Sequence, residues 1–439
     1  KIEITVNEAS NSVKDAPIDV TKVNNLSSDF IMGMDISSMI SELQSGVVYR
    51  DYDGNELKTL DDICRFIKEQ GINHIRVRVW NNPYDANGNG YGGGNNDVAK
   101  AKEFADACRN AGLKMLVDFH CSDLWTDPGK QQEPKAWKGY TLEQKKEALN
   151  TYITKSLNTI DPSKDVVDMV QVGNEITNGM LDIMPDRSKG ETYKDTWGNA
   201  KNAKILCGYL KAGIKAVREC TPKALVTLHL ESMGYGKCSE IMNAWEQNGV
   251  DYDVFGSSFY QFWQGNSSKN ALAGLQKIEN LAKSRGKMYA VMETSWLNSL
   301  KDADGTPNVI GEGHANAKVY SDDPQGQVDA LTDMYQTLLS NDNGLGAFYW
   351  EGAWIPVKAG WTNWKYNKDM SDRYGTGWAA QGAKGYYPDN KMYYNGQPAW
   401  GGCSWDNQTL FDSNGYPLQS LKFYKDSVSK GKEQIIALK

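Results

Sequence analysis

This 439-residue sequence lacks the signals that mark several large classes of protein. No apolar run approaches the roughly 18 residues of a membrane-spanning helix. No GxGxxG or GxxxxGKS/T motif follows a strand-like segment, so nothing supports a dinucleotide or nucleotide-phosphate site. Acidic and basic residues are interspersed, and the net charge of −7 argues against a nucleic-acid partner. We therefore expect neither a transmembrane segment nor a nucleic-acid interface.

Metal-binding and disulfide patterns are equally sparse. The four histidines include no HxH pair, and the seven cysteines show none of the short paired spacings of a zinc site. An odd number of cysteines leaves at least one unpaired in a monomer, which excludes a complete disulfide framework. Cys64, Cys108 and Cys207 fall in predicted helices, where we expect buried thiols. The chain begins at Lys1 without an apolar signal segment, so we expect a signal to have been removed or the ends trimmed.

Large aromatic residues are abundant instead. The sequence has 14 Trp and 23 Tyr, many of them beside Gly, Asn or Asp in predicted loops. On one interpretation they fill a large core. On the other they line a groove with stacking platforms for flat ligand faces, sugars included. Composition alone leaves both interpretations open.

From Phe30 onward, short apolar runs alternate with helical patterns. The strand-like runs are 30–36, 73–80, 113–120, 166–172, 224–230, 252–258, 287–293 and 345–350. The helical patterns are 59–70, 97–111, 142–158, 199–220, 239–248, 269–285, 325–339 and 418–428. Parallel strands need helix-length crossovers, and eight repeats favour an α/β fold closed into a (β/α)8 (TIM) barrel over an open doubly wound sheet. Residues 1–28 are polar, with one possible short strand at 2–6, so we predict an N-terminal extension at 1–28 and the barrel at 29–439.

Two of the predicted strands end in a glutamate. The run 169–175 ends in Asn174 and Glu175, and the run 287–293 ends in Glu293. The carboxyl ends of barrel strands share one face, which also receives the long loops 81–96, 121–140, 294–324 and 351–417. Two carboxyls across one cleft are what glycosidic bond cleavage needs: one protonates the leaving oxygen and the other attacks or activates water.

Other polar and aromatic residues occupy the same strand ends. Alternation sends Arg76, Arg78 and Trp80 to one side of their strand. The other candidates at or just after strand ends are Asp35, His120, Asp123, Trp125, His229, Tyr260, Trp263, Trp350 and Glu351. A metal site built from the histidines and glutamates is a competing interpretation, and the lack of short ligand spacings counts against it.

These residues belong to longer motifs that resemble one family. The matching segments are 33–38, 76–83, 118–125, 127–131, 171–175, 349–356 and 406–412. In order, and over about residues 29–425, they resemble the endo-β-1,4-galactanases of glycoside hydrolase family 53. The resemblance implies a clan A (β/α)8 barrel that cleaves β-1,4-galactan, the side chain of pectic polysaccharide, with retention of configuration.

The resemblance also implies roles for individual residues. Glu175 matches the general acid/base and Glu293 the nucleophile. Asn174 matches the residue that holds the 2-hydroxyl of the sugar at the cleavage point, and Trp350 matches the platform beneath that sugar. Tyr260 matches the strand-six tyrosine near the nucleophile. The supporting polar shell is matched by Arg78, His120 and His229.

The sequence departs from the family pattern at three positions. Cys121 stands where a Tyr is usual, Gln261 stands where a Pro is usual, and Trp296 follows the Glu-Thr-Ser motif. We expect these changes to alter the lining of the groove and the preferred chain length, and to leave the cleavage chemistry unchanged.

One acidic loop suggests a metal site. Asp302, Asp304 and Asn308 place oxygen side chains around Gly305, a pattern suited to a hard cation, although such stretches are also common as plain turns. The bacterial galactanases that the chain resembles hold calcium in this loop, with His where Thr306 stands. We therefore expect a structural Ca²⁺ that takes no part in catalysis.

The expected partner is a polysaccharide, β-1,4-galactan, and we expect a monomer. A polymer substrate too large to enter cells predicts a secreted, periplasmic or cell-surface protein. Two alternatives stay open at this stage. The same barrel could cut another β-linked glycan, mannan or glucan, or it could be a glycan-binding protein without activity.

Overall fold

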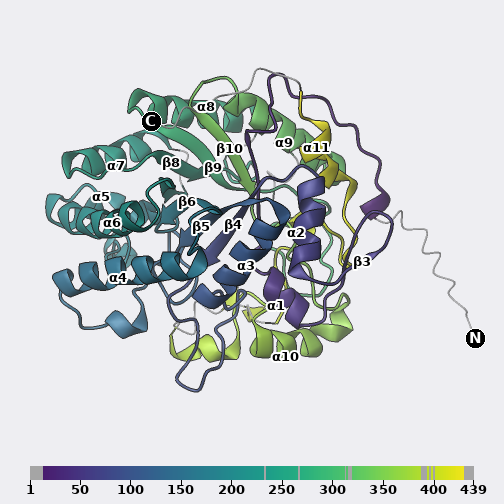
Figure 1. Ribbon diagram of the computed structural model, residues 1–439, viewed down its shortest axis with the longest axis horizontal. Helices are drawn as coiled ribbons and strands as arrows, with labels where there is room; N and C mark the ends of the chain where they lie inside the picture. The colour runs from purple at the N-terminus through teal and green to yellow at the C-terminus, as the bar shows by residue number, and fades with distance from the viewer. Residues whose placement is uncertain are drawn as a thin grey trace, which may run out of the picture.

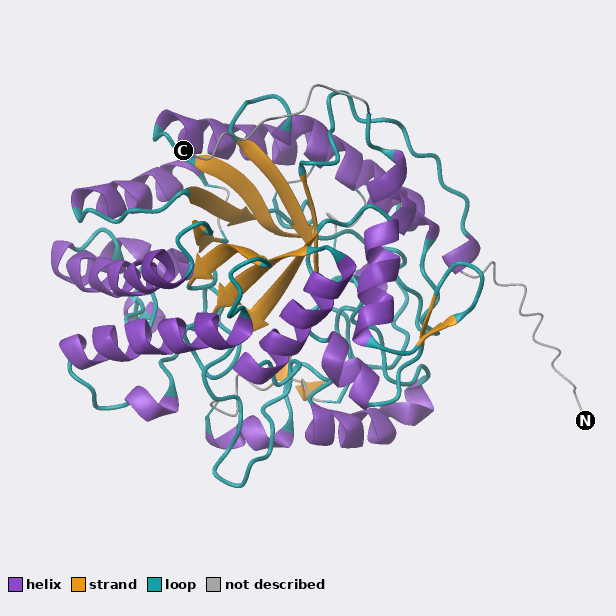
Figure 2. Ribbon diagram, viewed as in Figure 1, coloured by secondary structure: helices purple, strands orange, loops and turns teal. Residues whose placement is uncertain are grey.

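The computed structural model describes residues 13–231, 234–264, 267–311, 313–314, 319–386, 393–394, 397–398 and 401–429. Eight parallel strands close a barrel in the order β1-β10-β9-β8-β7-β6-β5-β4, in the centre of a ring of helices (Figure 2). They are β1 (Ile31–Asp35), β4 (His74–Val79), β5 (Lys114–Phe119), β6 (Val167–Val172), β7 (Leu225–Leu230), β8 (Val254–Ser258), β9 (Met288–Thr294) and β10 (Gly344–Tyr349). The predicted (β/α)8 barrel is confirmed, and every predicted barrel strand overlaps an observed one. The possible strand at 2–6 lies outside the described residues.

Helices follow most of the strands and cover the barrel. They are α2 (Leu60–Glu69), α3 (Val98–Ala111), α4 (Leu142–Ile160), α6 (Ala200–Cys220), α7 (Tyr235–Gln247), α8 (Ser268–Ser284) and α9 (Pro324–Leu338). Thr59 and Thr141 begin α2 and α4 with reciprocal capping boxes, and the Asp97 side chain caps α3. Gly112 ends α3 in the left-handed conformation, at φ 71°, and turns the chain directly into β5.

The hydrophobic periodicity of the sequence did not predict several short elements within the loops. These are α1 (Met39–Gln44), α5 (Tyr193–Thr196), α10 (Trp364–Tyr374) and the antiparallel pairs β2 (Tyr49–Arg50) with β3 (Glu56–Leu57) and β11 (Tyr393–Tyr394) with β12 (Gln397–Pro398). Helices α1 and α10 contact each other beside the barrel (Figure 1). The predicted C-terminal helix 418–428 is wrong in form: a 3₁₀ turn at Gln419–Lys422 leads into the short α11 (Phe423–Asp426). The predicted helix 239–248 begins earlier, because the N-cap of α7 is Gly234, which has no side chain to signal the start.

Buried side chains form distinct layers. Inside the lower barrel lie Ile31, Leu116, Met169, Val254, Ala290, Met292, Leu345 and Phe348. Alternate residues of the same strands pack outward against the helices. Gly33 makes room for the interior ring of Phe348, which a Cβ at that position would approach to 2.3 Å. A third cluster, rich in tryptophan, covers the carboxyl ends of the strands. The aromatic residues therefore serve both as core and as the wall of the functional face.

The described part of the predicted N-terminal extension lies against the barrel. Val23 and Leu26 are buried in the main core, and the Val23 N–H donates a hydrogen bond to the Ser427 carbonyl at 2.8 Å. Among the described helices, none combines the length and the apolarity needed to cross a membrane. Cys64, Cys108 and Cys207 are fully buried in α2, α3 and α6, as predicted.

Candidate active site

Arg76 is the cation at the centre of the polar layer above the apolar barrel interior. Its Nη1 lies 3.1 Å from Asp35 Oδ2, and its Nη2 lies 2.8 Å from Asp118 Oδ2 and 3.0 Å from Glu293 Oε1. Burial disfavours the charged guanidinium, but the three carboxyls outweigh this effect and raise the pKa of Arg76. A buried carboxylate without such a partner would be strongly destabilising. Arg76 therefore allows negative charge to collect at this depth.

Glu293, near the end of β9, receives two donors. Arg76 contacts its Oε1, and the Tyr260 hydroxyl donates to its Oε2 at 2.9 Å. Burial raises the pKa of Glu293 to about 7, with Arg76 and the Tyr260 hydrogen bond acting in the opposite direction. Burial and the neighbouring Glu293 raise the pKa of Tyr260 as well, so its hydroxyl remains a donor.

Glu175 follows β6 in an unusual conformation. Its φ of 48° lies in the left-handed region, which few residues other than glycine adopt. Two contacts hold it there: Ser258 Oγ donates to Oε1 at 2.7 Å, and the Glu175 backbone N–H donates to His229 Nδ1 at 3.3 Å. Burial and the charge of Glu293 raise the pKa of Glu175 well above its ordinary value.

The two glutamates thus titrate as a coupled pair in unequal surroundings. Glu293 has a guanidinium and a phenol as partners, whereas the side chain that bonds the Glu175 carboxyl within the described residues is the neutral hydroxyl of Ser258. The carboxyl next to the cation loses its proton first, and its charge then holds the proton on the other. Over the interval between the two titrations, Glu293 is ionised and Glu175 is protonated. These are the states required of a nucleophile and a general acid.

Both histidines at the site are neutral. His120 Nε2 lies 3.1 Å from Asp118 Oδ2, and its Nδ1 accepts the Thr126 N–H at 3.1 Å. Burial lowers the pKa of His120, and burial together with Arg76 lowers the pKa of His229 well below its ordinary value. Neither ring therefore adds a positive charge that would compete with Arg76.

Asn174, the residue before Glu175, contacts both Arg76 and His229. Its Oδ1 accepts from Arg76 Nη2 at 3.0 Å, and its Nδ2 donates to the Thr126 carbonyl at 2.8 Å. These bonds fix the amide, which is 3% exposed and retains one N–H for a ligand.

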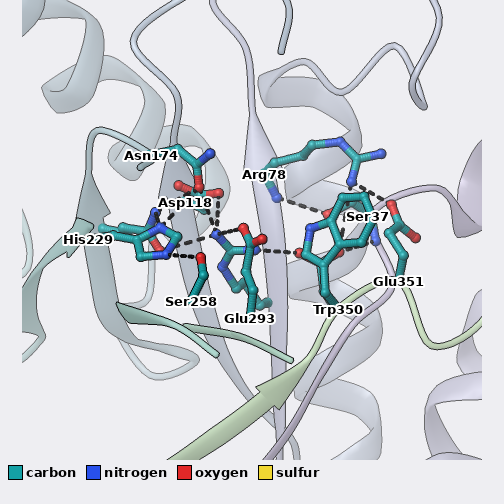
Figure 3. Close-up of polar contacts among 12 residues, drawn as sticks. Ser37, Arg78, Asp118, Asn174, His229, Ser258, Glu293, Trp350 and Glu351 are labelled. Carbon is teal, nitrogen blue, oxygen red and sulfur yellow. Dashed lines mark hydrogen bonds and ion pairs between the residues drawn. The ribbon is translucent and has the colours of Figure 1, made fainter. Parts of the chain in front are cut away.

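Arg78, two residues after Arg76 on β4, stabilises the loops at the mouth of the barrel. It forms an ion pair with Glu351 (Figure 3). It also donates to Ser38 Oγ at 3.0 Å and to the Gly93 carbonyl at 2.7 Å. Its guanidinium also lies 4.2 Å from the centre of a Trp125 ring. Arg78 therefore acts on the cleft by fixing the position of Trp125 and the β10 loop.

Tryptophans that differ in their exposure form the wall of the site. Trp125 stacks on Trp378, with ring centres 4.5 Å apart, and Trp350 meets Trp405 edge-on at 4.7 Å. Trp80 is fully buried, Trp350 is 7% exposed and Trp263 is 50% exposed. Of these three rings, that of Trp263 is the most exposed, and most of the Trp350 ring is covered.

The structure brings most of the predicted site residues together around Arg76 and the two glutamates. Asp123 is different: its carboxylate accepts the backbone N–H groups of Asn82 at 2.9 Å and Lys135 at 2.8 Å, and so joins two loops. Sequence reasoning did not select Ser258, Asp118 and Gln171 as site residues, and it noted Arg76 and Glu351 at strand ends without giving either a role. Arg76 lies on the same strand face as Arg78, so the sequence pattern could have predicted a role for it. No feature of the sequence around Ser258 indicated a role for that residue.

Three carboxylates meet in the loop after β9. Asp302, Asp304 and Asp406 each have an oxygen within 4.8 Å of the others. Asp406 was not predicted, because it lies about a hundred residues further along the chain. Burial raises the pKa of Asp304 to about 6 and, together with Asp304, that of Asp406 well above its ordinary value. Within the described part of the chain, Oδ1 of the predicted ligand Asn308 and Oδ1 of Asp406 are buried and have no hydrogen-bond partner. Oxygen donors left without partners suit a hard cation.

A protonated and an ionised carboxyl at the carboxyl ends of β6 and β9 define a barrel glycoside hydrolase. Comparisons with known proteins agree with this class. The model of glycosyl hydrolase family 53 matches residues 31–424. The endo-β-1,4-galactanase of Bacillus subtilis is 40% identical over 408 residues, which cover 92% of this chain and 88% of that protein.

Two further relatives extend the comparison. The arabinogalactan endo-β-1,4-galactanase of Humicola insolens is 30% identical over 74% of this chain and 89% of that protein. Among solved structures, the GH53 catalytic domain of Ignisphaera aggregans has a TM-score of 0.77 at 32% identity and covers 94% of this chain and all of that one. The chain belongs to glycosyl hydrolase family 53.

Proposed function

We propose that this enzyme is an endo-β-1,4-galactanase that cleaves galactan by a retaining double displacement. The observation that carries the proposal is the unequal pair of glutamates, with Glu293 against Arg76 and Glu175 beside a neutral hydroxyl. Glu293 attacks the anomeric carbon, while Glu175 protonates the departing glycosidic oxygen. Glu175 then removes a proton from the water that releases the glycosyl-enzyme.

Substrate contacts follow from the positions of the remaining groups. Asn174 has one N–H free for the 2-hydroxyl of the sugar at the cleavage point. Trp350 and the half-exposed Trp263 provide apolar faces for neighbouring sugar units. Arg78, Asp35 and Asp123 are buried and bonded to other groups of the protein, and we assign them a supporting role.

A reducing-sugar assay on linear β-1,4-galactan tests the substrate, with mannan and cellulose in parallel. We expect activity on galactan that is lost in Glu293→Ala. Cleavage of mannan or cellulose without cleavage of galactan would overturn the substrate assignment. Proton NMR of the first product tests retention, since a β-configured new reducing end is expected and an α-configured one contradicts the double displacement.

We also propose that the acidic loop binds a structural Ca²⁺. Asp302, Asp304 and Asp406 would supply carboxylate oxygens, and Asn308 would supply its amide oxygen. The ion would neutralise buried acid groups and tie the β9 loop to the 3₁₀ turn at Asp406–Gln408. Calcium should raise the unfolding temperature, and a chelator should reverse the effect. An unfolding temperature that ignores both would contradict the site.

The polymeric substrate supports export of the enzyme, and we propose that it acts outside the cytoplasm as a monomer. Activity in the culture supernatant, periplasm or cell surface of the source organism tests the location. Light scattering coupled to gel filtration tests the monomer, for which the 48.9 kDa of one chain is expected.

A further inference from the structure

A series of hydrogen-bonded side chains connects Arg76 to the carboxyl of Glu175. Gln171 Oε1 accepts from Arg76 Nη2 at 3.3 Å, and Gln171 Nε2 lies 3.0 Å from His229 Nδ1. His229 Nε2 lies 2.9 Å from Ser258 Oγ, which in turn lies 2.7 Å from Glu175 Oε1. Figure 3 shows the link from His229 to Ser258. Arg76, Gln171, His229 and Ser258 are all 2% exposed or less.

Arg76, the first residue of this series, determines which atom donates and which accepts in each of the following hydrogen bonds. Arginine only donates, so the carbonyl of Gln171 faces Arg76 and the amide nitrogen faces His229. His229 Nδ1 also receives the backbone N–H of Glu175, which can only donate. The acceptor Asn174 Oδ1, 3.2 Å from Nδ1, already accepts from Arg76 Nη2 at 3.0 Å and Gln171 Nε2 at 3.1 Å. Nδ1 is therefore the acceptor, and the neutral ring carries its proton on Nε2.

The same logic fixes the proton of Ser258. Its Oγ accepts the Nε2–H of His229, so its single hydroxyl proton points to Oε1 of Glu175. In a protonated carboxyl the carbonyl oxygen is the better acceptor, so the oxygen that accepts this bond is the one without the acid proton. Glu175 is partly exposed, and its Oε2 makes no hydrogen bond with the residues that the structure describes. Oε2 is the oxygen left for the proton that goes to the leaving group.

We propose that Ser258 is a positioning residue for Glu175: held by His229, it occupies Oε1 and so directs the catalytic proton to Oε2. This inference rests on the proposed function, because it assigns the acid proton of that reaction to one atom. Arg76 then has two roles. It binds the nucleophile directly, and it orients the acid through three intermediate side chains.

The proposal predicts a pH effect. The charged groups that face Glu175 are Glu293 on β9, Glu231 after β7 and Asp127 after β5. Tyr260 and the neutral His229 are the other titratable groups beside it. Burial and all three of these charges favour the protonated acid, and the Ser258 hydroxyl favours the ionised form. Loss of the hydroxyl should therefore raise the pKa of Glu175 and move the basic limb of kcat/KM upward, by about 0.5 to 1 pH unit.

The experiment compares Ser258→Ala and Ser258→Thr with the parent enzyme on galactan and on a dinitrophenyl β-galactobioside. Dinitrophenolate leaves without protonation, so the first step on the aryl substrate does not need the acid. The control is Ser257→Ala, on the same strand, whose hydroxyl bonds Tyr289 on the opposite face at 2.5 Å. Each rate is measured across the pH range.

For Ser258→Ala we expect kcat on galactan to fall about 10- to 100-fold, with the basic limb shifted upward. The formation of the aryl-derived glycosyl-enzyme should change less than about threefold, and Ser258→Thr should restore most of the activity. Equal losses on both substrates, or an unmoved basic limb, would overturn the proposal. A parent enzyme inert on galactan would instead refute the substrate assignment, and the same ratios could then be measured on whichever glycan it cleaves.

Discussion

Replacing Tyr260 with phenylalanine removes one of the two donors that keep the nucleophile ionised. The Tyr260 hydroxyl bonds Glu293 Oε2 at 2.9 Å and lowers the pKa of this carboxyl, which stands at about 7. A hydrogen bond to a charged group contributes about 1.5 kcal/mol or more, so its loss raises the pKa of Glu293 by about one unit. The ring stays in place, since phenylalanine keeps its contacts with Phe262 and Trp405.

The loss of activity should therefore depend on pH. At pH 6 the ionised fraction of Glu293 falls from about 9% to about 1%, whereas at pH 8.5 it falls only from about 97% to about 76%. The loss of kcat/KM at pH 6 should exceed the loss at pH 8.5 by about sevenfold. A further loss common to both pH values is expected if the phenol also stabilises the transition state.

Kinetics on galactan between pH 5 and 9 measure this ratio, with Tyr289→Phe as the control. Tyr289 is equally buried on β9, and its hydroxyl bonds Ser257. A uniform loss across the pH range, with the acid limb unmoved, would refute the view that Tyr260 sets the protonation of Glu293.

Three further predictions concern other groups. On galactan, Glu175→Ala and Glu293→Ala should each lose activity on the order of 10³-fold or more. With an activated aryl substrate, azide should give a β-glycosyl azide with the first variant and an α-glycosyl azide with the second, and a swap of these products would reverse the assigned roles. Burial raises the pKa of Glu279 to about 7, so the folded state holds a proton that the unfolded state releases, and stability should fall as the pH rises from about 4.5 to 7. Glu279→Gln should remove this loss, worth about 3 kcal/mol at pH 8 by urea unfolding, and an equal effect at pH 5 would contradict it. Asp406→Asn should reduce the calcium-dependent rise in unfolding temperature, while Asp322→Asn, at an exposed position, should leave it intact.

The repeat of apolar runs and helical patterns was sufficient to predict the barrel. Parallel strands are buried on both faces, so each one appears as a short apolar run wherever it lies in the chain. Glu175 and Glu293 were predicted for the same reason, since a polar residue at the end of such a run must lie at the mouth of the barrel. The short helices α1 and α10 gave no such signal, because their contacts with each other and with the long loops determine their shape.

The sequence alone determined which residues could carry the reaction, and the tertiary structure decided what each of them does. Arg76, Asp35, Asp118 and Glu293 come from four strands and share one guanidinium only after the barrel closes. Ser258 contacts Glu175 from a strand 83 residues away, and Asp406 joins Asp302 across 104 residues. Protonation depends on distance and burial, which are properties of the folded chain. Residue type and strand position therefore fixed the candidates, and packing assigned the acid, the nucleophile and their supports.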